Sequence, residues 1–285
     1  MRNLTFRRCT AANNSHAGFG ILLNGMNTKP HTLDIKFEDC LIDSRSQRHQ
    51  AGMDDMGQLI FMVGKDAIFP PPMNGTLLVD NLTVLGGVTP AVQLWGVPAT
   101  VSTIVRNSVF SHVAKDGPVW LSRPKGSKGL PYYNSPLTIL PSFGSTVGFP
   151  LGGLTLENTT IWYDLETYGD DIPEGSLRSS QSGRLGCWPC SYGNLVMPAI
   201  TARAFNASTG LVGIHGDLTV RTHVNASTMA QCRDWRAKSS TWDIMRGGLQ
   251  VNSSCDPCQA GWGAPETRKE GVDLKVRCER LANPG

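Results

Sequence analysis

Short runs of alternating apolar and polar residues dominate the first 160 positions of the chain. The segment Leu33–Phe37 alternates strictly, and Leu154–Leu156 repeats the pattern on a smaller scale. A period of two residues is typical of β-strands that bury one face. Further short apolar runs lie at 20–23, 58–63, 91–95 and 118–121, and Gly, Pro or polar residues soon end each of them. We therefore predict an all-β fold.

A six-residue pattern recurs five times and follows several of these runs directly. It reads apolar, polar, Asn or Asp, two variable residues and apolar, and its copies begin at Phe6, Phe37, Val79, Val105 and Leu156. The third position holds Arg8 in the first copy and then Asp39, Asn81, Asn107 and Asn158. Asn and Asp tolerate the left-handed backbone conformation better than any residue except Gly, so this position predicts a turn between two strands. The intervals of 31, 42, 26 and 51 residues between copies indicate stacked repeats with loops of variable length.

This pattern resembles the right-handed parallel β-helix of the pectin-lyase-like superfamily, in which short strands form coils and Asn commonly occupies a turn. The resemblance implies a right-handed parallel β-helix solenoid with long loops over residues 1–183. Coils stacked about 4.8 Å apart would let the turn side chains bond to one another in a ladder. Cys9 and Cys40 each follow the turn position and would lie on neighbouring coils, as stacked thiols or as a disulfide. We favour thiols because buried cysteine packs as a small apolar residue.

The segment 184–285 is rich in cysteine and either continues the solenoid or forms a small separate module. We predict disulfides among its six cysteines, without assigning the pairs: Cys187, Cys190, Cys232, Cys255, Cys258 and Cys278. Zinc is the alternative, because 187–190 and 255–258 are both C-x2-C motifs. The 64 residues between these motifs far exceed the usual spacing of about 15 to 20, so we predict no metal site. The sequence Cys255–Gly261 also resembles the units of extracellular cysteine-rich repeats.

Glycosylation sequons are also more frequent than chance predicts. The chain contains eight N-x-S/T sequons, whereas its composition predicts roughly two. We assign Asn81 and Asn158 to turns and predict glycans at four other sites: Asn74, Asn206, Asn225 and Asn252. Sequons and clustered cysteines together predict an extracellular or cell-surface location. The first residues lack the apolar run of a signal peptide, so we expect the chain to be part of a larger protein with its signal upstream.

Composition excludes several classes of partner. Charged residues make up 17% of the 285 positions, and the net charge is +3, so no basic surface for nucleic acid is expected. No apolar run reaches the 18 or more residues that a membrane span requires. The remaining partners are polysaccharides or other cell-surface proteins, and no motif indicates a cofactor.

Two groups of residues are candidates for function. An aromatic platform for sugar rings is predicted from five residues: Tyr132, Tyr133, Trp162, Tyr163 and Tyr168. The alternative is that these rings pin long loops onto the strands. The resemblance also implies carboxylates with a nearby histidine and a basic residue, as in polygalacturonases, and the candidates are Asp170, Asp171, His215 and Arg221, with Asp54 and Asp55 as a further pair.

The motifs around the catalytic candidates depart from those of the polygalacturonases. The expected Asn-Thr-Asp element is absent upstream, and no Arg-Ile-Lys follows His215. A lyase would need acidic calcium ligands and an arginine base, and no such cluster is legible on the predicted strands. The sequence therefore favours a non-catalytic β-helix segment with a structural or carbohydrate-binding role. A polysaccharide hydrolase or lyase of the same fold is the alternative.

Overall fold

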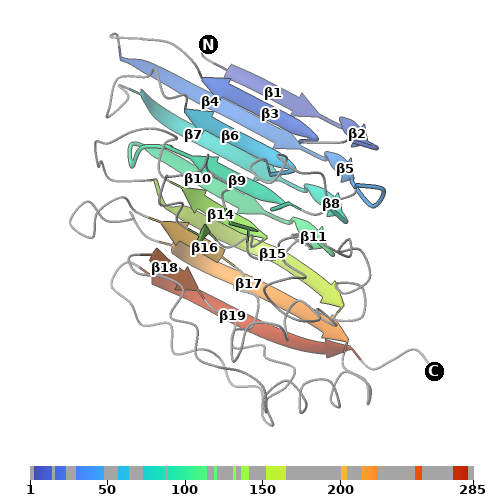
Figure 1. The fold of residues 1–285 in the computed structure, drawn as a ribbon. Coiled ribbons are helices and arrows are strands. Elements are labelled where there is room, and N and C mark those ends of the chain that lie inside the picture. The colour runs from blue at the N-terminus through green and yellow to red at the C-terminus, as the bar shows by residue number, and fades with distance from the viewer. Residues whose placement is uncertain are drawn as a thin grey trace.

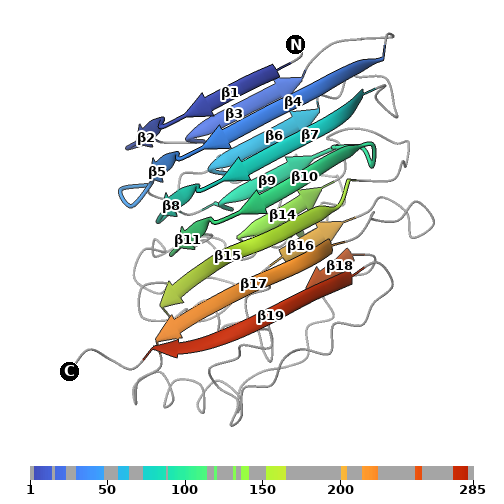
Figure 2. The same ribbon diagram turned by 180° about the vertical axis from the view of Figure 1, so that it is seen from behind.

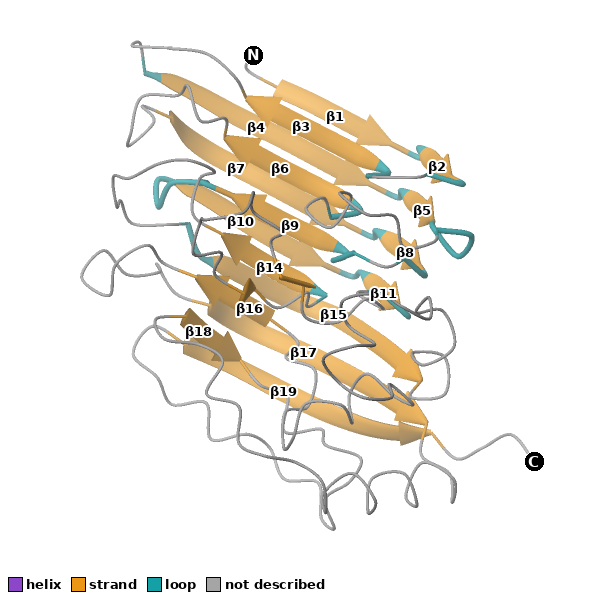
Figure 3. Cartoon of the chain, in the orientation of Figure 1, coloured by secondary structure: helices purple, strands orange, loops and turns teal. Residues whose placement is uncertain are grey.

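The described part of the chain is all-β and contains no helix, which confirms the predicted class (Figure 3). The computed structural model describes residues 3–14, 17–23, 30–47, 57–63, 73–87, 89–113, 119–120, 131–132, 136–140, 152–164, 200–203, 214–223, 248–251 and 272–281. Nineteen strands, β1 to β19, lie within these ranges.

One long sheet carries most of the strands, and all of its pairs are parallel. One half of it contains β1 (Asn3–Arg7), β4 (His31–Glu38), β7 (Met73–Asp80) and β10 (Val101–Arg106). The other half contains the short strands β2 (Thr10–Ala12), β5 (Leu41–Asp43), β8 (Thr83–Leu85) and β11 (Val109–Ser111). The strand β15 (Leu154–Asp164) pairs with both halves, and β17 (Ile214–His223) and β19 (Val272–Leu281) follow it.

A second sheet has the order β18-β16-β14-β9-β6-β3. Its strands are β3 (Phe19–Leu23), β6 (Leu59–Val63), β9 (Val92–Trp95), β14 (Leu137–Leu140), β16 (Ile200–Arg203) and β18 (Gly248–Val251). All pairs are parallel except β16 with β18, which are antiparallel. A separate antiparallel pair joins β12 (Val119–Trp120) to β13 (Pro131–Tyr132).

The chain alternates between the two sheets in a regular order (Figures 1 and 2). We call one long strand, its short partner and the following strand of the second sheet a repeat: β1–β3, β4–β6 and β7–β9 are repeats 1 to 3, and β10, β11 and β14 form repeat 4. The inward residues of both sheets form one apolar core. Phe37, which is 1% exposed, stacks on Phe6 with ring centroids 4.7 Å apart, so equivalent residues of successive repeats lie on one another.

The predicted turn residues all adopt the left-handed conformation. Asp39, Asn81, Asn107 and Asn158 have φ between 44° and 55°, and Arg8, which departs from the pattern, has φ 53°. In the first four turns the backbone N–H donates to a carbonyl of the next strand of the sheet, for example from Asn107 to Glu157 at 2.9 Å. The four donors are Arg8, Asp39, Asn81 and Asn107. The pattern therefore predicted the position of the turn even where the residue type differed.

The predicted ladder of turn side chains forms in two separate pieces. Asn81 Nδ2 donates to Asp39 Oδ1 at 2.9 Å, and Asn158 Nδ2 donates to Asn107 Oδ1 at 3.0 Å. Between these pieces, Asn107 Nδ2 donates to Asp80 Oδ1 instead of reaching Asn81. The carboxylate of Asp80 is a stronger acceptor than an amide oxygen, which explains the break.

A second left-handed turn follows three of the four short strands, β2, β8 and β11, and the sequence pattern did not reveal it. Asn13, Gly86 and His112 have φ of 55°, 68° and 54°. Each follows a short strand directly, and each donates its backbone N–H to the next repeat. All three residue types tolerate this conformation better than most, but Ser44, which follows β5, does not adopt it, so the position does not recur in every repeat.

The residues that follow the first turn form an inward column of Cys9, Cys40, Leu82, Ser108 and Thr159. Cys9 and Cys40 are free thiols, which confirms the favoured alternative. The Thr159 hydroxyl, fully buried, donates toward the carbonyls of Val105 and Glu157 at 3.1 and 3.2 Å. The cysteine, serine and threonine side chains of this column can therefore bond to nearby carbonyl groups, whereas Leu82 contributes only to the apolar core.

In β17 and β19 no turn separates the two halves of the long sheet. The register of β15 on β17 shifts between Leu156 and Thr159, so Asn158 lies in a bulge. Opposite this bulge, Gly216 has φ 104°, and β17 then pairs with β19 without a shift. The strands β17 and β19 therefore run without interruption through both halves of the long sheet.

The predicted cysteine-rich segment is described only in part. Cys278 lies in β19, in register with Val220. The remaining five cysteines lie outside the described residues: Cys187, Cys190, Cys232, Cys255 and Cys258. The disulfides predicted there therefore remain a prediction.

Candidate functional site

The outward face of the long sheet presents polar side chains in columns, because residues in register on parallel strands point the same way. One column contains Thr5, Lys36, Leu78, Ile104, Thr155 and His215. The neighbouring column contains Asn3, Asp34, Thr76 and Ser102. These are the non-core positions of the alternating runs, so the sequence contained them as a pattern without indicating a site.

A groove of about 420 Å³ lies across these columns on β1, β4 and β7. Five of its residues are polar and one is apolar: Asn3, Thr5, Asp34, Lys36, Thr76 and Leu78. Thr5 and Lys36 are exposed, and neither side chain has a hydrogen-bond partner among the described residues. The groove therefore offers hydroxyl, carboxylate and ammonium groups to a polar ligand beside a small apolar surface.

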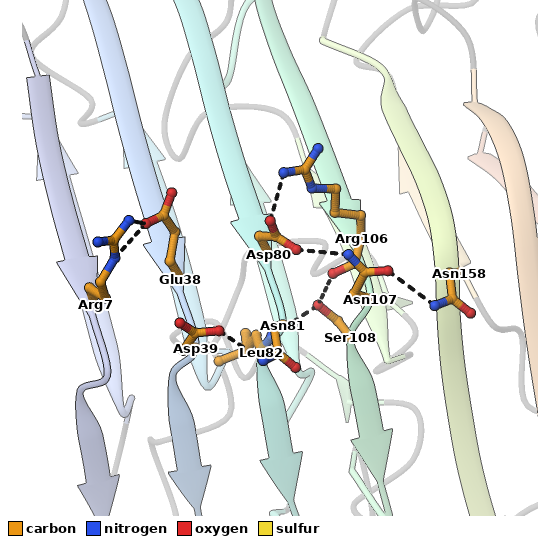
Figure 4. Close-up of polar contacts among 10 residues, drawn as sticks. All are labelled: Arg7, Glu38, Asp39, Asp80, Asn81, Leu82, Arg106, Asn107, Ser108 and Asn158. Carbon is orange, nitrogen blue, oxygen red and sulfur yellow. Dashed lines mark hydrogen bonds and ion pairs between the residues drawn. The ribbon is translucent and has the colours of Figure 1, made fainter.

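A row of charged residues borders the groove at the ends of the long strands (Figure 4). Arg7 donates twice to Glu38 Oε2, at 2.8 Å from Nε and 2.6 Å from Nη2. Further along the row, Arg106 Nη2 donates to Asp80 Oδ2 at 2.7 Å. Two ion pairs thus join neighbouring strands beside the groove.

The two carboxylates at the centre of this row are each bonded to an arginine. Glu38 and Asp80 lie in register on adjacent strands, but Glu38 turns to Arg7 and Asp80 turns to Arg106 (Figure 4). The hydrogen bond from the Arg106 guanidinium lowers the pKa of Asp80, and the Asn107 amide acts in the same direction. The acid of a glycosidase needs a raised pKa, so Asp80 is unsuited to that role.

The predicted catalytic residues are only partly described. His215 and Arg221 are exposed on the same face of β17, six residues apart. At about 3.3 Å per residue this separation is roughly 20 Å, so the two side chains do not meet at one sugar ring. The other candidates lie outside the described residues: Asp54, Asp55, Asp170 and Asp171.

Trp162 and Arg221, which the sequence assigned to different roles, are neighbours. They lie in register on β15 and β17, and both point outward from the sheet. The Trp162 ring also contacts His112, with centroids 5.7 Å apart and a tilt of 46°. Of the other predicted platform residues, Tyr132 and Tyr163 lie in β13 and β15, whereas Tyr133 and Tyr168 lie outside the described residues.

The predicted glycosylation site Asn74 differs from the two sequons assigned to turns. Asn74 is exposed on β7, and its Oδ1 accepts a hydrogen bond from Thr32 at 2.7 Å, which leaves Nδ2 available for a glycan. The Nδ2 atoms of Asn81 and Asn158 instead donate to neighbouring turn residues. The remaining predicted sites lie outside the described residues: Asn206, Asn225 and Asn252.

The described ranges contain neither a metal-binding cluster nor a helix that could span a membrane. No three His, Cys, Asp or Glu side chains come together there as a metal site. Nor does this part of the chain include a helix of the length and apolarity that would cross a bilayer. Comparisons with protein-family models, with characterised proteins and with solved structures found no match.

Proposed function

We propose that the chain is a segment of a right-handed parallel β-helix that binds a linear polysaccharide on the outward face of its long sheet, without cleaving it. The parallel pairing of strands 26 to 51 residues apart supports the solenoid and the resemblance to pectin-lyase-like proteins. The groove on β1, β4 and β7 is the observation that carries the binding role.

The composition of the groove supports a carbohydrate ligand. Sugar hydroxyl groups both donate and accept hydrogen bonds, and Asp34, Lys36 and Thr76 offer an acceptor, a donor and a group that does both. Leu78 supplies an apolar contact for a ring face. Outward columns advance about 4.8 Å per strand, a distance comparable to the length of one sugar ring, so an extended polymer can meet equivalent positions on successive strands.

The charged residues of the same face disfavour catalysis. Both carboxylates at the groove border are bonded to arginines, and the pKa of Asp80 is lowered. A hydrolase or lyase remains the alternative function, and its acid and base would have to come from Asp170 and Asp171, with His215 or Arg221.

We propose an extracellular or cell-surface location for the chain. The exposed Asn74 sequon with its available Nδ2 supports an extracellular or cell-surface location, and disulfides within 184–285 would be compatible with it. We also propose that the segment belongs to a larger surface or secreted protein. Polysaccharides, or other proteins of the cell surface, are the proposed partners.

Affinity electrophoresis in gels that contain neutral or acidic linear polysaccharides tests the proposal. We expect retardation in at least one gel, a dissociation constant raised about tenfold by Lys36→Ala, and no change for Arg45→Ala, which removes an equal charge away from the groove. Absence of retardation in every gel would contradict the binding role. Release of new reducing ends or unsaturated products would replace it with the hydrolase or lyase.

A further inference from the structure

Cys9 and Cys40 lie directly opposite each other on repeats 1 and 2. The pairs Arg7–Glu38 and Thr10–Leu41 are in register on either side of them. The Leu41 N–H donates to the Cys9 carbonyl at 2.9 Å, which fixes the two backbones at the spacing of adjacent parallel strands. The two cysteines are therefore 31 positions apart in the chain and neighbours in the fold.

Both thiols point to the same side of the sheet. Cys9 Sγ lies 3.5 Å from the Arg7 carbonyl oxygen, and Cys40 Sγ lies 3.3 Å from the equivalent Glu38 carbonyl oxygen. Cys40 Sγ also lies 3.6 Å from the Phe6 carbonyl oxygen, so it reaches across to repeat 1. The two side chains thus point the same way in the inward column, and the Cys40 sulfur atom approaches the backbone of β1.

This arrangement is close to the geometry of a disulfide. Adjacent strands lie about 4.8 Å apart, within the range of about 4.4 to 6.8 Å seen for the Cα atoms of bridged cysteines. The Cβ atoms of bridged residues are about 3.5 to 4.5 Å apart, so side chains stacked at about 4.8 Å need to approach by roughly 0.3 to 1.3 Å.

We propose that Cys9 and Cys40 are a redox pair whose disulfide fastens repeat 1 to repeat 2. The bond joins the strand pair β1 and β2 to the pair β4 and β5, at the residue that follows the first turn in each repeat.

The two thiols react in a defined order with a small-molecule disulfide such as oxidised glutathione. Cys9, half-buried, attacks one sulfur of the reagent, which releases one glutathione thiol and leaves a mixed disulfide on Cys9. Cys40, which is 2% exposed, then attacks the Cys9 sulfur and releases the second glutathione. Two protein thiols and one oxidised glutathione become one protein disulfide and two glutathione thiols, which carry the two protons. Cys9 reacts first because it is the more exposed of the two thiols, and burial also raises the pKa of Cys40.

Peptide mapping of the full chain after incubation with oxidised glutathione tests the proposal. Trypsin cleaves after Arg8, Lys36 and Arg45, and the Lys29–Pro30 bond resists it. We expect peptides 9–36 and 37–45 to appear as one disulfide-linked species, with a mass about 2 Da below the sum of the two reduced peptides. Amide exchange in β1 and β2 should slow by about tenfold in the oxidised protein.

The variants C40S and C9S provide matched controls. In C40S, the mixed disulfide on Cys9 should persist because no second thiol resolves it, whereas in C9S the buried Cys40 should remain unmodified. The proposal is overturned if wild-type protein keeps glutathione on Cys9, or if both peptides stay reduced. Because the reaction is followed on wild-type protein, the result does not depend on whether either variant folds.

Discussion

Replacement of the turn residue Asn107 separates the two contributions that this position makes to stability. Asn107 has φ 50°, its side chain donates to Asp80 Oδ1, and it accepts from Asn158 Nδ2, both at 3.0 Å. Asn107→Ala removes both side-chain bonds and places a Cβ in the left-handed conformation. Asn107→Gly removes the same bonds but tolerates that conformation freely.

The expected losses follow from these contacts. Left-handed backbone costs an ordinary residue about 1–2 kcal/mol, and two exposed hydrogen bonds contribute about 0.5 kcal/mol each, so Asn107→Ala should lower the free energy of unfolding by about 2–3 kcal/mol. Asn107→Gly loses the same bonds and about 0.4–1 kcal/mol of backbone entropy, which gives a loss of about 1–2 kcal/mol. The glycine variant should therefore be the more stable of the two by about 1 kcal/mol.

Urea unfolding followed by circular dichroism measures this order. Ser102, exposed on β10, is the matched control, because its backbone is extended and Ser102→Gly should be less stable than Ser102→Ala by about 0.5–1 kcal/mol. The slope of the free energy against urea should stay the same in all four variants. If Asn107→Gly proves no more stable than Asn107→Ala, the left-handed turn does not determine the residue at this position.

Three further predictions concern other described residues. Gly216→Ala should lower the free energy of unfolding by more than about 3 kcal/mol or abolish soluble expression, because a Cβ at φ 104° would overlap the Leu156 carbonyl oxygen; thermal unfolding measures this loss. The pKa of Asp80 is lowered, so its pairing with Arg106 stabilises the protein fully above the unfolded-state pKa of about 4. This contribution to the free energy of unfolding is lost as the pH falls through the lower folded-state pKa. In a profile of stability against pH, Asp80→Asn should remove this loss on the acid side, which is worth less than about 1 kcal/mol. Expression in a secreting eukaryotic cell should attach a glycan that Asn74→Gln removes, whereas the same replacement at the turn sequons Asn81 and Asn158 should remove no glycan mass; mass spectrometry measures this.

The strands and first turns were predictable because both arise from local chemistry. Alternation placed Leu33, Ile35 and Phe37 on the buried face, and the structure buries all three. Asp39 and its equivalents indicated the turn position. Arg8 adopts the same left-handed conformation although its residue type does not favour it, because β1 pairs in register with β4.

The groove and the second turn were not predictable in the same way. Groove residues such as Asn3 and Thr76 are 73 positions apart in the chain, and only the register of three strands brings them together. The second turn uses Asn13, Gly86 and His112, whose conformation follows from the hydrogen bonds of neighbouring repeats. Register and inter-repeat bonding are non-local, so a single strand pattern does not contain them.

The unequal spacing of the repeats has a consequence for how the chain folds. Pairing of β7 with β10 closes a loop of 26 residues, whereas pairing of β10 with β15 closes one of 51. Closing a loop of twice the length costs only about 0.6 kcal/mol more, so the longer excursion hardly slows the docking of the next strand. A repeat that has already docked presents its free edge as a template, and order then spreads along the stack one repeat at a time. The same arithmetic makes the connections between repeats the places where evolution can lengthen this chain at the least cost to its folding.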